Sequence, residues 1–114
     1  MEITALLSAQ VLTASGQTAA FEVPPQALPG QTEISLEVEA TAVSGTTPSA
    51  TFSLQWSDDG TDWDTPSPAQ SLTAITAVGN AVESFTVQGV YYRLAYVISG
   101  TTPSFTVTAR AVTE

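Results

Sequence analysis

The chain has 114 residues, 43% of them hydrophobic, and its eleven acidic residues face only two arginines, for a net charge of -9. A chain of this length buries a single core, so residues 1–114 are expected to form one domain. The absence of His, Cys and Lys excludes zinc fingers, Cys or Ser-His-Asp nucleophiles, Schiff-base chemistry and disulfides, and the acidity makes nucleic acids and anionic membranes poor partners.

The N-terminal segment is expected to be neither a signal peptide nor a membrane span. Glu2 stands where a signal peptide carries cations, and Ser8 and Gln10 interrupt the apolar run. No stretch approaches the roughly 18 apolar residues that a spanning helix needs. These features predict a soluble, unprocessed protein.

Period-two alternation predicts eight strands, at 3–12, 17–23, 33–43, 50–57, 70–76, 82–87, 90–98 and 104–112. No segment of the chain has a clean helical period. The residues that alternate inward and should form the core include Leu36, Val38, Phe52, Leu54, Trp56 and Val107. We therefore predict an all-β fold, an antiparallel β-sandwich of Ig-like or jelly-roll form with seven to nine strands.

The loop at 24–31, PPQALPGQ, is rich in proline and cannot be a central strand. Pro24, Pro25 and Pro29 give it a stiff, apolar surface. We predict that these three prolines contribute to a contact surface for another protein.

A six-residue motif, SGTTPS, occurs twice, at 44–49 and at 99–104. Each copy lies between two predicted strands, which predicts two equivalent hairpins. In that interpretation Gly45 and Gly100 supply positive φ, while Pro48 and Pro103 fix the return leg. The repeat indicates either pseudo-symmetric halves of a sandwich or one good hairpin loop that arose twice.

The most distinctive motif is WSDDGTDW, at 56–63. Its Asp-Asp-Gly centre is typical of a tight turn in which Gly60 supplies positive φ, with Trp56 and Trp63 on the two legs covering the turn. The pattern also resembles hairpins of carbohydrate-binding sandwiches, and it misses the sialidase Asp-box by one position. A tryptophan-stabilised hairpin is the simpler interpretation.

Four acidic residues crowd this loop, and carboxylates are ligands that calcium prefers. The candidate ligands are Asp58, Asp59, Asp62 and Asp64. The EF-hand pattern is not met, because Gly60 follows too soon and Ala69 stands where the last ligand belongs. We expect a solvated acidic loop and no metal or other cofactor.

Strand 90–98, VYYRLAYVI, is apolar on both faces apart from Arg93. We expect Arg93 to pair with an acid or a backbone carbonyl, or to extend to the surface. Aromatic residues occupy both odd-numbered and even-numbered positions of this strand, and these positions face opposite sides of a sheet. At least one aromatic side chain should therefore face away from the core. Tyr91, Tyr92 and Tyr96 are candidates for a protein interface, which we favour over a sugar-stacking platform.

The order and spacing of these motifs resemble those of small virion proteins of tailed bacteriophages. Such proteins carry a loop like SGTSPS, a hairpin of the form S-x-D-G-x-x-W and an ending like YxRLxxxxSGTxPSF. The matching segments here are Ser44 to Ser49, Ser57 to Trp63 and Tyr92 to Phe105. The resemblance implies a β-sandwich attached to a virion, as a head-decoration or tail-associated protein made in the host cytoplasm.

From this resemblance, and because the sequence offers no candidate catalytic residues, we expect a structural protein and not an enzyme. The expected partners are capsid or tail proteins and further copies of the chain, with a trimer as the first expectation because capsid lattices offer three-fold positions. A carbohydrate-binding module is the alternative, and an exposed coplanar strip of aromatics would favour it. A fragment of a larger adhesin ranks third, because Met1 and the close at Glu114 look like natural ends.

Overall fold

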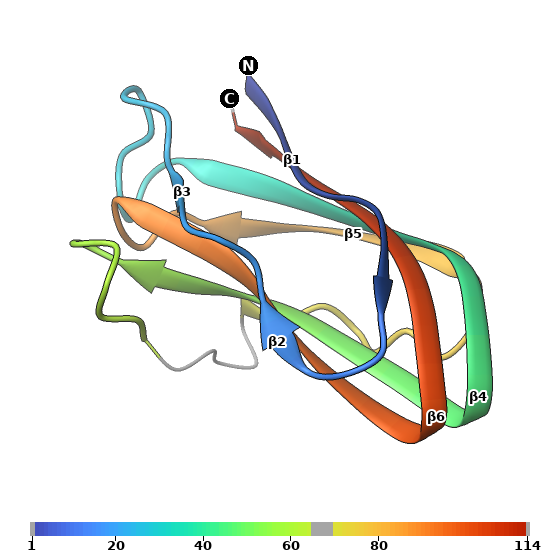
Figure 1. The fold of residues 1–114 in the computed structure, drawn as a ribbon. Helices are drawn as coiled ribbons and strands as arrows, with labels where there is room; N and C mark the ends of the chain where they lie inside the picture. Colours follow the sequence, from blue (N-terminus) through green and yellow to red (C-terminus); the bar gives the residue numbers. More distant parts are fainter. Residues whose placement is uncertain (1, 65–69, 114) are drawn as a thin grey trace.

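The computed structural model describes residues 2–64 and 70–113, which form one antiparallel sheet (Figure 1). Its strands are β1 (Glu2–Leu12), β2 (Gly16–Gln17), β3 (Phe21–Glu22), β4 (Glu33–Ser57), β5 (Gly79–Thr86) and β6 (Tyr91–Thr113). The strand order is β1-β6-β4-β5, and β2 and β3 also pair with β6. This part of the chain has no α-helix, and hence none that could cross a membrane. The all-β prediction is confirmed.

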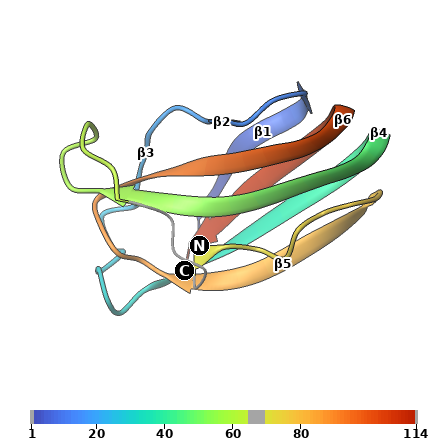
Figure 2. The same ribbon diagram turned by 90° about the horizontal axis from the view of Figure 1, so that it is seen from below.

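Strands β4 and β6 are long, and each bends back on itself. β4 has 25 residues. A straight strand of that length would span about 80 Å, at about 3.3 Å per residue. The longest dimension of the molecule is only 42 Å, so the strand must turn. Figures 1 and 2 show that the two halves of each strand lie in different layers and face each other.

The bend lies where the two SGTTPS copies pair with each other. The Cα partners there are Ser44 with Ser104, Thr46 with Thr101, and Ser49 with Ser99. Between these pairs the register shifts, so that two residues of one strand stand opposite one residue of the other, as in a β-bulge. If each residue of one SGTTPS copy is replaced by its equivalent in the other copy, the same three pairs result. An approximate local two-fold axis therefore relates the two copies.

Gly45 and Gly100 make this close crossing possible. Their φ angles are 111° and 118°, in a region that side chains other than glycine rarely adopt. A Cβ atom on Gly45 would lie 2.7 Å from the carbonyl oxygen of Thr102, and one on Gly100 would lie 2.8 Å from that of Thr47. Both threonines have φ 47°, and each donates its hydroxyl to the preceding carbonyl at 2.8 Å. The two copies thus repeat the same local structure.

The prediction that 44–49 and 99–104 are hairpin loops is therefore wrong. Each copy lies inside one continuous strand, and the two copies pair across the sheet instead of each turning its own chain around. Pro48 and Pro103 do not fix a return leg. They stand in the bulged stretches, where the missing proline N–H disturbs the ladder least. The positive φ expected at Gly45 and Gly100 is confirmed.

One hydrophobic core fills the space between the two halves of the sheet. β4 keeps its alternation on both sides of the bend, so its even-numbered residues point inward in both halves. All six predicted core residues are buried: Leu36, Val38, Phe52, Leu54, Trp56 and Val107. β6 adds Tyr92, Leu94 and Phe105, and β5 adds Phe85.

The described strands number six, and the hydrogen bonds join them in a single sheet, so a sandwich of seven to nine strands is not confirmed. Four of the predicted strands merge into β4 and β6, and the one at 17–23 divides into β2 and β3. The predicted strand at 70–76 makes only isolated bridges, Ile75 to Ala50 and Ser71 to Ser53. Residues 65–69, which include Ala69, lie outside the described residues.

The two edge strands carry features that oppose pairing with another chain. β1 contains two register shifts, and Ala9 beside them has φ 46°. On β5, Glu83 is the partner of the buried Leu36, which places a charge on the inward side of an edge strand. Both edge strands are therefore poor templates for pairing with another chain.

Candidate functional site

The segment after β4 forms a closed loop whose base is Trp56 and Asp64. The Asp64 N–H donates to the Trp56 carbonyl at 3.1 Å, and the Trp56 N–H donates to Asp64 Oδ1 at 2.8 Å. Gln55 adds a third bond, from its Nε2 to the Asp64 carbonyl oxygen at 3.0 Å. The Asp64 carboxylate is thus used to close the loop.

A second carboxylate, that of Asp59, organises the turn itself. Its Oδ1 accepts the Thr61 N–H at 2.8 Å, the Asp62 N–H at 2.9 Å and the Ser57 hydroxyl at 2.9 Å. These bonds hold the pKa of Asp59 well below its ordinary value, and the same charge raises the pKa of Asp62 through a shared hydrogen bond and repulsion. Gly60, with φ 78°, supplies the positive φ that the motif predicts.

We expect Asp59 to remain ionised well below pH 3.9, near which a free aspartate titrates. Because its pKa is lowered on folding, the charged turn is favoured at neutral pH, and this contribution is lost progressively as the pH falls from the ordinary pKa through the lowered one. A carboxyl-carbon NMR titration measures this pKa directly. Asp59→Asn is the control, since it keeps one acceptor oxygen without the charge. An Asp59 pKa at or above the ordinary value would contradict this account of the turn.

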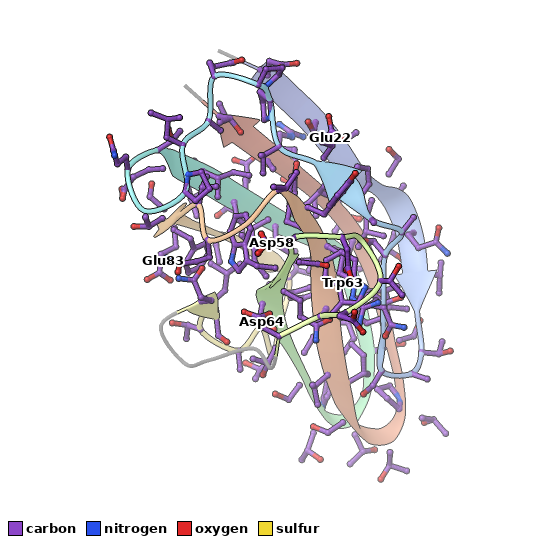
Figure 3. All side chains as sticks on the ribbon, turned by 90° about the vertical axis from the view of Figure 1, so that its left-hand side faces the viewer. Glu22, Asp58, Trp63, Asp64 and Glu83 are labelled. Atoms are coloured by element: carbon purple, nitrogen blue, oxygen red, sulfur yellow. The ribbon has the colours of Figure 1, made fainter. Side chains whose placement is uncertain are left out.

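The two tryptophans lie on opposite sides of the sheet, so the prediction that both cover the turn is wrong. Trp56 is 3% exposed and packs in the core against Tyr92, with ring centres 5.8 Å apart. Trp63 lies on the outer face, where Figure 3 shows it beside β6. The guanidinium carbon of Arg93 stands 4.5 Å from the centre of the Trp63 ring. Such stacking is a favourable cation–π contact.

An open hollow of about 420 Å³ lies beside the loop. Its lining residues are Trp56, Ser57, Asp58, Asp62, Trp63, Asp64 and Gln88. The four candidate calcium ligands do not converge in it, and residues 2–64 and 70–113 contain no group of three acidic side chains placed to hold a metal ion. Asp59 does not line the hollow, and Asp64 Oδ1 already accepts a backbone N–H.

Removal of divalent cations is expected to leave the melting temperature unchanged. The carboxylates that could bind calcium are either committed to the loop backbone or apart from one another. Thermal unfolding with a chelator and with millimolar calcium tests this expectation. A rise of many degrees with calcium would reveal a site on the folded protein, because a ligand that binds only the folded state stabilises it by mass action.

The three candidate tyrosines have different environments. Tyr92 is only 1% exposed, so its prediction as an interface residue is wrong; Phe21 and Trp56 pack against it, and burial raises the pKa of its hydroxyl. Tyr91 and Tyr96 are half-buried. The Tyr91 ring lies beneath Gly60, and the Tyr96 ring packs on Phe52 with centres 6.1 Å apart. Of the three candidate tyrosines, Tyr92 alone is fully covered by other parts of the chain.

The three candidate prolines are brought together. Pro24, Pro25 and Pro29 line a hollow of about 250 Å³ between the 24–31 loop and the start of β6. Its remaining lining residues are Glu22, Val23, Ala27, Gly89 and Val90. Pro24 itself is buried, while Pro25 and Pro29 are exposed. Leu28 and Val90, at 52% and 41% exposed, leave this end of the molecule apolar at its surface.

Sequence reasoning missed Gln55, which joins the loop to β6. Its Oε1 accepts the Nε–H of Arg93 at 2.7 Å while its amide nitrogen binds the loop. The alternation of β4 places Gln55 on the outer face, but only the register reveals that Arg93 stands directly opposite. Of the partners expected for Arg93, neither an acid nor a backbone carbonyl is present among the described residues; the side-chain amide oxygen of Gln55 takes that place.

No protein-family model matches the chain, and no curated protein matches it.

Proposed function

We propose that this chain is a structural protein of a tailed-bacteriophage virion, a capsid decoration or accessory protein that binds the shell through protein–protein contacts. The observation that carries the proposal is the position of the three segments that resemble such proteins. They are not scattered, because two of them pair at the bend and the third, the loop after β4, packs on β6 through Trp63 and Arg93. In this proposal the facing halves of the bent sheet serve as the two layers of a β-sandwich.

The proline-lined hollow is the contact surface that we propose for the shell. Pro25, Pro29, Leu28 and Val90 expose apolar atoms at one end of the molecule. Exposed apolar surface of this kind is typical of sites that another protein covers. The loop also needs little further ordering on binding, because its Gly30 N–H donates to the Val87 carbonyl at 2.6 Å. A stiff, apolar loop suits a permanent contact.

Decoration of a symmetric particle implies many copies and self-association, for which a trimer remains our first expectation. We propose that the chain is made in the host cytoplasm, acts on the finished virion and has no catalytic role. The net charge of -9 then gives each decorated particle a strongly negative surface, which keeps particles apart. A tail-associated virion protein is the alternative within this proposal, because the same fold is compatible with either position.

The arrangement of aromatics does not favour the carbohydrate-binding alternative. Sugar platforms need ring faces open to solvent, whereas Trp56 and Tyr92 are buried and one face of Trp63 is covered by Arg93. Tyr91 and Tyr96 are half-buried beneath Gly60 and against Phe52. Protein contact is the better-supported role.

Co-sedimentation tests the proposal. The purified protein is mixed with undecorated capsids and, separately, with tails of the phage that encodes it, and each mixture is spun through a density gradient. The protein is expected to move with one of these structures at a fixed copy ratio. Pro25→Ser combined with Leu28→Ser should reduce the bound amount, while Val82→Ser, an equally exposed change on β5, serves as the control. Binding to neither structure, together with specific retention on a glycan array, would favour the carbohydrate module.

A further inference from the structure

The two arginines of this acidic chain are used differently. Arg110 forms an ion pair with Glu37, its neighbour across the strands, at 3.0 Å. Arg93 has no carboxylate within ion-pair distance in residues 2–64 and 70–113. In a protein with eleven acidic residues, an arginine without an acidic partner is unexpected.

The Arg93 side chain is nevertheless held in place from two directions. Its Nε donates to Gln55 Oε1 at 2.7 Å, and its guanidinium lies over the Trp63 ring at 4.5 Å. Gln55 cannot turn freely, because its other end donates to the Asp64 carbonyl oxygen. The guanidinium is therefore fixed in orientation before any partner arrives, which reduces the entropy lost on binding.

These contacts leave the outer edge of the guanidinium without a partner. The two Nη atoms have no acceptor among the described residues, and together they form the fork that matches a carboxylate in a bidentate pair. Two of the nearby acids are committed elsewhere, Asp59 to its turn and Asp64 to the Trp56 N–H. The free fork is thus available to an acid from outside the chain.

We propose that Arg93, positioned by Trp63 and Gln55, is a binding site for a carboxylate of another protein chain. The carboxylate comes from an Asp or Glu side chain, either of a second copy or of a different protein. Val97 lies four residues beyond Arg93 on the same face of β6 and is 63% exposed, so an apolar surface that a protein partner would cover continues along the strand. This site shares no residue with the proline-lined hollow and does not depend on the virion assignment.

An NMR titration tests the site with a defined probe. N-acetyl-glutamate-N-methylamide is added to labelled protein up to about 100 mM, because a single charge-assisted contact gives dissociation constants on the order of 10–100 mM. Sodium chloride is exchanged for the probe so that the ionic strength stays constant. We expect saturable shifts of the Arg93 Nε–H and Trp63 indole N–H signals with this probe and none with the matched glutamine compound.

Three variants show whether the arginine fork is responsible. Arg93→Gln should abolish the saturable shift at Trp63, whereas Arg110→Gln, with the same net charge, should retain it. Arg93→Lys keeps the charge but loses the fork, so its affinity should fall several-fold. A dispersed spectrum confirms that each variant is folded. Absence of saturable shifts in the unmodified protein, or equal shifts in Arg93→Gln, would overturn the proposal.

Sedimentation equilibrium distinguishes the two sources of the carboxylate. If the partner is a second copy, the unmodified protein self-associates as its concentration rises, and Arg93→Gln weakens this at least tenfold while Arg110→Gln does not. If the partner is a different protein, Arg93→Gln leaves the self-association unchanged while the probe still binds the unmodified chain. Either result supports the Arg93 site and identifies where the bound carboxylate comes from. Self-association that depends equally on Arg93 and Arg110, without binding of the probe, would contradict the proposal.

Discussion

Replacing Trp56 with alanine is expected to lower the free energy of unfolding by about 3–5 kcal/mol. Trp56 is 3% exposed, packs on Tyr92 and donates its indole N–H to Gln70 at 3.3 Å. Truncation would leave a large cavity in the core and the Gln70 side-chain amide without its partner. Since small domains are stable by only about 5–15 kcal/mol, the loss would be a large part of the total.

Trp63→Ala is the matched control, because it removes the same side chain from the outer face. Trp63 is half-buried, and its main contact is the stack with Arg93, so we expect a loss of about 1 kcal/mol. Chemical denaturation of both variants measures the difference. If the two substitutions cost the same, or if Trp56→Ala changed the melting temperature by only a degree or two, the position of Trp56 in the core would be wrong.

The second large effect is expected at the bend of β4 and β6. Gly45→Ala and Gly100→Ala should each cost roughly 1–2 kcal/mol for the positive φ. The new methyl group would also displace backbone atoms 2.7–2.8 Å away, as overpacked residues do, which adds about 1–3 kcal/mol. Because the two copies are related by the local two-fold axis, the two substitutions should have similar effects.

Gly30→Ala separates the two causes. Gly30 also has positive φ, 81°, but a Cβ atom there would meet nothing within 4 Å. Its substitution should therefore cost only the conformational part. Thermal or denaturant unfolding of the three variants provides the comparison. Equal losses at Gly30, Gly45 and Gly100 would show that the close approach of the two strands does not contribute.

Much of the sheet could be predicted from the sequence because one side of it is buried. Alternation in β4 correctly places Leu36 and Val38 in one half of the core and Phe52 and Leu54 in the other. The period of two depends only on neighbouring residues, so a single strand reveals it. Alternation is ambiguous in β6, because aromatic residues occupy positions on both faces of the strand. The pattern therefore does not separate the buried Tyr92 from the half-buried Tyr91.

The bend of β4 and β6 could not be predicted from the sequence. A hairpin loop and a β-bulge that pairs with a second bulge need the same types of residue. Glycine with positive φ and proline without an N–H suit both structures. Only the partner, 55 residues away, decides between them, and alternation carries no information on that partner. The Gln55–Arg93–Trp63 contact was missed for the same reason, since it depends on the register of β4 against β6.

Electron cryomicroscopy of capsids and tails with bound protein tests whether this chain is a virion structural protein. Particles lacking the protein are imaged before and after its addition, and the two symmetric reconstructions are subtracted. We expect additional density at repeated, symmetry-related positions, large enough for a β-domain with a longest dimension of 42 Å. Its proline-lined end should face the particle. Difference maps without such density, for capsids and tails alike at saturating protein, would contradict the assignment as a virion structural protein.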